Sequence, residues 1–148
     1  FAGAIFSAGL WMVGPENVAG LDAVAPYLVI DRFFVFFSFV LCLAGGLVSL
    51  LAGAYLPEHR IDRGEFFSLV VFSTVGAQAL VAAGDLLSLF VALETMSLGV
   101  YAMIGLRRAS VRASEAALKY FLLGSFAAAI LLFAGALLYG ATGHTDLA

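Results

Sequence analysis

The sequence predicts an all-α protein, specifically a polytopic transmembrane helical bundle. Of its 148 residues, 64% are apolar and only 11% are charged, whereas soluble domains carry about 25% charged residues. The mean hydropathy is +1.09, and several apolar runs reach the roughly 17–25 residues that a membrane-spanning helix needs. The alternating pattern of barrel strands is absent, so the spans are expected to be helices.

Apolar runs divide the chain into five expected helices within a single transmembrane domain. The first run is the shortest and opens the chain without an initiator Met, so we expect it to be a truncated helix of a longer membrane protein. The other four are long enough to span a bilayer. The runs cover about residues 1–13, 31–56, 66–83, 86–106 and 115–139.

Short local signals predict where these helices end. Pro57 is expected to end the second run, because proline has no N–H group for the helical hydrogen bonds. The Gly84-Asp85 turn is so short that the runs on either side of it must be antiparallel neighbours. Ser114 is expected to cap the last helix, since a serine oxygen can accept a hydrogen bond from the first turn.

Arginines are concentrated in alternate connections. The connections 57–65 and 107–114 are basic, whereas the others contain only Arg32, at the edge of a run. The positive-inside rule therefore predicts that these two connections are cytoplasmic and that Asp85 lies on the opposite side of the membrane. The arginines concerned are Arg60, Arg63, Arg107, Arg108 and Arg112.

Charge and cysteine content exclude several kinds of function. The net charge is −3 and there is no basic cluster, so nucleic acid is not an expected partner. Cys42 is the only cysteine, so neither an internal disulfide nor an iron–sulfur site is expected. The sequence shows no haem ligand pair, phosphate loop or dinucleotide fingerprint. No cofactor or metal is expected in this chain, and any redox chemistry is expected elsewhere.

Glu94 is the first candidate functional residue, because it lies near the middle of the 86–106 run. A helical rise of 1.5 Å per residue places it about 12 Å inside the span. An ionised carboxylate at such a depth costs at least about 2.5–3.5 kcal/mol, and intramembrane acids usually serve transport. Ser97 is expected one turn away on the same face. The alternative is a structural carboxyl group that is protonated or hydrogen-bonded to a neighbouring helix.

Lys119 is the second candidate, as the only lysine of the chain and one that lies within a run. A lysine releases its proton far more readily than an arginine does. The alternative is that Lys119 extends to the interface and pairs with Glu115 at spacing i,i+4. Helix lengths place Glu94 and Lys119 about 10 Å apart along the membrane normal. We therefore expect a water chain or a third group between them rather than a salt bridge.

Polar residues on the 66–83 run form a possible polar path. Ser73, Thr74 and Gln78 share roughly one side of that helix and, with Ser97, could line a hydrated route. Hydrogen bonds between helices explain these residues equally well.

Two segments near the end of the chain carry a resemblance to a known family. They read DLLSLFVALETMSLGVYAMIGLRR and SEAALKYFLLGSFAAAILLFAGALLYGATG. They resemble the antiporter-like membrane subunits of respiratory complex I, and most closely subunit N (subunit 2) of proton-pumping NADH:quinone oxidoreductases. The resemblance covers residues 31–143 and is strongest over 85–143, and it implies that the chain is about the first third of such a subunit.

The resemblance implies roles for particular residues. Glu94 occupies the position of the family's essential intramembrane glutamate, and Lys119 that of the lysine in its KYF motif, on a proton path. A further lysine that pairs with the glutamate is expected after residue 148. The family commonly has proline where this chain has Gly99, which leaves the local geometry of that helix open.

The resemblance also implies partners. It implies a hetero-oligomer with other complex I membrane subunits in the lipid bilayer of a bacterial inner membrane. NADH, FMN, iron–sulfur clusters and quinone are expected in partner subunits. Two other functions stay open from the sequence: a subunit of a multisubunit cation/proton antiporter or membrane-bound hydrogenase, and a non-conducting scaffold subunit.

Overall fold

Helices make up nearly all of the structure, a computed structural model that describes residues 2–15, 25, 27–59, 61, 64–107 and 109–147. Over these residues the helices α2 to α5 are each long and apolar enough to cross a membrane. The predicted all-α transmembrane fold is therefore confirmed. The helices are α1 (Ala2–Val13), α2 (Arg32–Glu58), α3 (Glu65–Ala82), α4 (Leu86–Ile104) and α5 (Val111–Thr142).

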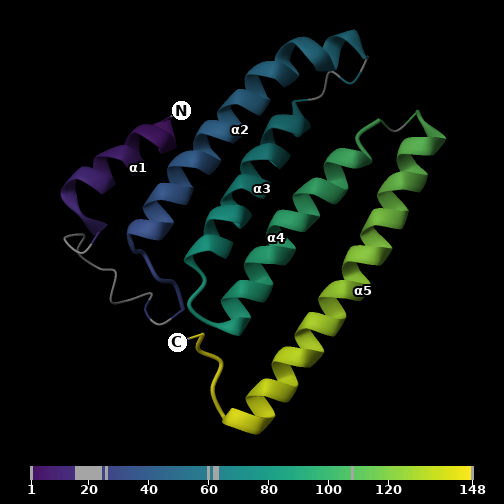
Figure 1. Ribbon diagram of the computed structural model, residues 1–148. Coiled ribbons are helices and arrows are strands. Elements are labelled where there is room, and N and C mark those ends of the chain that lie inside the picture. The colour runs from purple at the N-terminus through teal and green to yellow at the C-terminus, as the bar shows by residue number, and fades with distance from the viewer. Residues whose placement is uncertain are drawn as a thin grey trace.

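The helices stand in a row in chain order, and each packs against the next. Successive helices run in opposite directions, and α5 diverges from α4 toward its C-terminal end (Figure 1). Few side chains are buried, and many large apolar ones are exposed. Such outer surfaces are suited to lipid or to further protein rather than to water.

Two helix ends differ from the predicted ones. The prediction that Pro57 ends its helix is wrong, because α2 includes Pro57 and continues to Glu58. A proline in the last turn removes a single hydrogen bond, so the helix can continue for one more residue.

The last helix begins earlier than predicted. Ser110, not Ser114, caps α5, and its side-chain oxygen accepts a hydrogen bond from the N–H of Ala113 at 3.3 Å. Both serines can cap a helix. The residues between them include Arg112 and Ala113, which favour helix, so the helix begins at the first serine.

The connection between α3 and α4 is a tight turn, as predicted, and it is also buried. Asp85 is only 3% exposed and caps α4, its carboxylate accepting the N–H of Ser88 at 2.6 Å. Two extended segments hold this turn from either side. The carbonyl of Tyr27 accepts the Ser88 hydroxyl at 2.8 Å, and the carbonyl of Thr145 accepts the N–H of Leu86 at 2.8 Å.

Helix α4 is continuous through Gly99, so the lack of a proline there leaves the helix intact. A Cβ atom at Gly99 would lie 3.0 Å from the Cβ of Ser73 and 3.2 Å from the carbonyl oxygen of Leu69. The missing side chain thus lets α3 and α4 approach closely, as small residues do between membrane helices.

The membrane orientation stays a prediction. Arg60, Arg63 and Arg108 lie outside the described residues. Arg107 and Arg112 are described, and both are exposed beside the connection from α4 to α5.

Candidate functional site

Glu94 is the ninth residue of the 19-residue α4, so it lies halfway along a membrane-spanning helix. Its Oε1 atom is buried and has no hydrogen-bond partner among the described residues. Leaving a buried polar atom unpaired is costly, and most such atoms in native structures have a partner. Among the described residues, Glu94 is therefore the one with a buried side-chain oxygen that lacks a hydrogen-bond partner.

The helical geometry shows which neighbour Glu94 faces. At 100° per residue, Phe90 and Tyr101 lie on the same side of α4 as Glu94, within about 40° and 20° of it. Phe90 lines a cavity between α4 and α5, and the ring of Tyr101 contacts α5 at Phe121. Glu94 thus faces α5, while Gly99, about 140° around the helix, faces α3.

The register of α4 against α5 locates the surroundings of Glu94. A Cβ atom at Gly105 would lie 3.4 Å from the Cβ of Ala117, and Tyr101 lies opposite Phe121, their ring centroids 5.7 Å apart. Because the two helices are antiparallel, seven residues back along α4 from Tyr101 correspond to seven residues forward along α5 from Phe121. Glu94 therefore lies opposite the turn of α5 that begins at about Ala128. Ala128 is 6% exposed, so the helices come together at this level.

Lys119 does not lie near Glu94. The same register places it level with Met103, near the Arg107 end of α4 and about 14 Å from Glu94 along the helix axis. Its ammonium group pairs with Glu115 at 2.5 Å, and the two side chains are 69% and 57% exposed. The structure therefore separates the two candidate groups and gives Lys119 a partner on its own helix.

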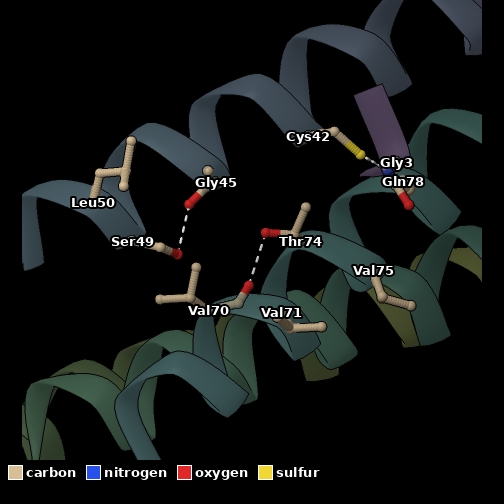
Figure 2. Close-up of a pocket in the computed structure, with 11 residues that line it drawn as sticks. Gly3, Cys42, Gly45, Ser49, Leu50, Val70, Val71, Thr74, Val75 and Gln78 are labelled. Atoms are coloured by element: carbon tan, nitrogen blue, oxygen red, sulfur yellow. Dashed lines mark hydrogen bonds between the residues drawn. The ribbon is translucent and has the colours of Figure 1, made fainter. Parts of the chain in front are cut away.

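Thr74 and Gln78 lie on the far side of α3 from Glu94. Gln78 donates hydrogen bonds from Nε2 to the oxygen of Ser38, at 3.2 Å, and to the sulfur of Cys42, at 2.9 Å. Thr74 donates to a carbonyl of its own helix. Figure 2 shows Thr74 and Gln78 directed toward α2, on the wall of a pocket of about 460 Å³.

Close contact between α3 and α4 separates this pocket from Glu94. Gly76 lies against the backbone of Met96, and Ser73 donates a hydrogen bond to the carbonyl of Met96 at 3.1 Å. Ser97 stays on the Glu94 side, about 60° around α4 from it. The structure thus divides the predicted polar path. Thr74 and Gln78 lie on one side of the α3–α4 contact, and Ser97 lies on the other.

A second cavity, of about 430 Å³, lies between α4 and α5 at the end where α5 diverges. Phe90 is one of its walls and lies one turn before Glu94. Polar residues join leucines around this cavity, which we call the α4–α5 cavity. Its lining includes Tyr27, Asp85, Leu87, Leu131, Tyr139 and Thr145.

Sequence reasoning missed Tyr101, which fills the space between α4 and α5 on the other side of Glu94. Its ring contacts Tyr120 and Phe121. The sequence spacing could have pointed to Tyr101. It follows Glu94 by seven residues, or two helical turns, and so lies on the same face of the helix. Among the described residues no group of three or more His, Cys, Asp or Glu side chains could hold a metal ion.

Comparison with known proteins agrees with the resemblance. Residues 83–148 match the family described as NADH:quinone oxidoreductase/Mrp antiporter, TM, a range that includes the turn at Asp85, α4 and α5. NADH-quinone oxidoreductase subunit N 1 of Sorangium cellulosum is 69% identical over 147 residues, which is 99% of this chain and 29% of that protein. The chain therefore spans less than a third of the length of this curated relative.

Solved structures show the same arrangement of helices. A chain of respiratory complex I from Thermus thermophilus with bound aureothin is 30% identical, with a TM-score of 0.63, over 99% of this chain and 36% of that one. A chain of an archaeal membrane-bound sulfane sulfur reductase is 24% identical with a TM-score of 0.76, over 98% of this chain and 31% of that one, and shows the fold alone. By its sequence identity along the whole chain, this membrane protein belongs to the NADH-quinone oxidoreductase subunit N family.

Proposed function

We propose that the chain is part of a proton-translocating membrane subunit of NADH:quinone oxidoreductase, in which Glu94 takes up and releases protons. Electron transfer from NADH to quinone, in other subunits, would drive this movement. The observation that carries the proposal is the buried, unpaired Oε1 of Glu94 halfway along a membrane-spanning helix. Intramembrane carboxyl groups of this kind commonly mark ion or proton routes.

The surroundings of Glu94 favour conduction over a scaffold role. A carboxyl group that only stabilised the bundle would be expected to use both oxygens in hydrogen bonds. Glu94 faces α5 at the level of Ala128, which has no polar side chain to offer. We propose that its missing partner is water or a cation from another part of the assembly, and either one permits a change of protonation.

Lys119 is proposed as a second group that exchanges protons, near the Arg107 end of α4. Its pairing with Glu115 is exposed on α5, so other helices or subunits can reach it in the assembly. The distance from Glu94 excludes a direct transfer between the two groups. Ser97, Thr74 and Gln78 are proposed as minor polar contacts for water, on the two sides of the α3–α4 contact.

The names of the relatives support the proposed partners and location. We place the protein in a bacterial inner membrane, since the relatives named subunit N are bacterial. Other complex I membrane subunits would complete the hetero-oligomer. FMN, iron–sulfur clusters and the binding sites for NADH and quinone would belong to partner subunits.

The proposal is tested with the full-length subunit in its complex. Glu94→Gln removes the exchangeable proton while keeping the shape of the side chain, and Glu58→Gln, at the exposed end of α2, is the matched control. NADH oxidation by quinone and proton transport are measured together in sealed vesicles. We expect Glu94→Gln to lower coupled proton transport at least tenfold in an assembled complex, and Glu58→Gln to leave it unchanged.

Two outcomes would contradict the proposal. A normal ratio of protons to electrons in Glu94→Gln would show that Glu94 carries no protons. Sodium-dependent proton exchange without NADH, in a complex lacking flavin and iron–sulfur subunits, would identify an antiporter subunit instead.

A further inference from the structure

Tyr101 closes the seam between α4 and α5. Its ring meets those of Tyr120 and Phe121 edge-on, with centroids 5.1 and 5.7 Å away and interplanar angles of 83° and 86°. Its hydroxyl rests on Gly124, where a Cβ atom would lie 1.8 Å from Oη and 2.7 Å from Cζ. The tyrosine thus occupies the space that the missing side chain of Gly124 leaves open.

This aromatic cluster lies between Glu94 and the Arg107 end of the seam. Tyr101 follows Glu94 by seven residues on the same face, about 10 Å along the helix. Tyr101 is half-buried between the two helices, whereas Tyr120 and Phe121 keep 48% and 42% of their surfaces exposed. A ring that fills a constriction blocks ions by excluding water. The Tyr101 ring therefore occupies the direct route along the seam from the Arg107 end to Glu94.

The other side of Glu94 is different. There Phe90, one helical turn from Glu94, lines the α4–α5 cavity. At about 30 Å³ per water molecule in the liquid, a space of about 430 Å³ could hold roughly 14 waters. Toward the Arg107 end the Tyr101 ring thus fills the seam, whereas toward the Asp85 end a cavity begins one helical turn from Glu94.

We propose that Tyr101 is a gate, seated on Gly124, that controls the access of water to Glu94 from the Arg107 end of the membrane. The gate opens when the Tyr101 ring leaves Gly124 and closes when it returns. Water can then reach Glu94 from the Arg107 end only while the gate is open. The inference rests on the proposed role of Glu94 but concerns access to that group, not the coupling to NADH oxidation.

The test measures how fast a water-soluble carbodiimide modifies Glu94 in the complete complex. The reagent is added to one face of sealed vesicles at a time, and mass spectrometry of the Glu94 peptide gives the rate. An Ala109→Cys variant, labelled with an impermeant thiol reagent, reports which face carries the exposed connection next to Arg107. Because the readout is chemical, it does not depend on pumping.

Gly124→Ala is the first variant, because its methyl group cannot coexist with the hydroxyl of a closed Tyr101. We expect at least a fivefold faster modification of Glu94 from the Arg107 face only. Gly140→Ala is the matched control on the same helix, since a Cβ atom there meets nothing within 4 Å. Tyr101→Phe keeps the ring, so its rate should stay within twofold of the wild-type rate.

Tyr101→Ala keeps the proposal testable if Gly124→Ala fails to assemble, because it opens the same space without adding an atom. Wild-type rates from the Arg107 face in an assembled Tyr101→Ala complex would overturn the gate. A faster rate together with normal pumping by Glu94→Gln would leave the gate standing and reject the proposed function.

Discussion

Gly76 lies directly against the backbone of Met96, and this contact sets the distance between α3 and α4. A Cβ atom at Gly76 would lie 2.4 Å from the Met96 nitrogen and 2.8 Å from its Cα. The two helices thus touch through their backbones at the depth of Glu94. This contact closes off the space that would otherwise connect Gln78 to Glu94.

Substitution of Gly76 by alanine is expected to destabilise the subunit. The added methyl group must push the backbones apart, and overpacking of this kind costs about 1–3 kcal/mol. Gly53→Ala is the control in α2, because a Cβ atom there meets nothing within 4 Å, and alanine favours helix over glycine by about 1 kcal/mol. Thermal unfolding of the purified complex should show a lower midpoint for Gly76→Ala alone, and equal midpoints would refute the prediction.

Replacement of Gln78 by leucine should loosen the packing of α3 on α2. The change removes hydrogen bonds to Ser38 and Cys42, and bonds between membrane helices contribute about 0.6 kcal/mol each on average. We expect a loss of about 1 kcal/mol and faster alkylation of Cys42 by a maleimide. Thr74→Val is the control, because among the described residues the Thr74 hydroxyl bonds only to Val70 of its own helix. Unchanged alkylation in Gln78→Leu would contradict the expectation.

Removal of the Asp85 carboxylate should lower the free energy of unfolding more than removal of a comparable, exposed cap. Asp85→Ala removes a buried N-cap of α4, and such caps contribute about 0.5–2 kcal/mol. Asp31 caps α2 in the same way, with a 2.8 Å bond from the N–H of Phe34, but this bond is exposed. Unfolding in denaturant should therefore show a larger loss for Asp85→Ala than for Asp31→Ala, and the reverse order would argue against the buried turn.

Lys119→Ala should leave stability nearly unchanged. The pair with Glu115 is exposed, and pairs of this kind contribute only about 0.3–0.5 kcal/mol. If Lys119 exchanges protons, coupled transport should nevertheless fall severalfold in Lys119→Ala. It should fall in Lys119→Arg as well, because arginine keeps its proton. Normal transport in both variants would show that Lys119 carries no protons and is only an interfacial residue.

The positions of the membrane spans followed from the sequence because they depend on local properties. The thickness of the bilayer fixes the length of an apolar run that can cross it, so the four spans could be predicted without knowing how they pack. The Gly84-Asp85 turn likewise required its two helices to be antiparallel neighbours. The start of α5 was predicted wrongly at Ser114, because Ser110 has the same capping chemistry four residues earlier.

The sequence by itself thus determined the candidate membrane helices, the position of Glu94 near the middle of one of them, and the family. The tertiary structure decided which groups meet. Contacts between distant residues, such as Gly76 with Met96 and Gly124 with Tyr101, set the register and the facing of each helix. They turn Glu94 toward α5, direct Gln78 toward α2 and place Tyr101 across the seam. No local pattern fixes such contacts, because they depend on how the backbones of different helices fit together.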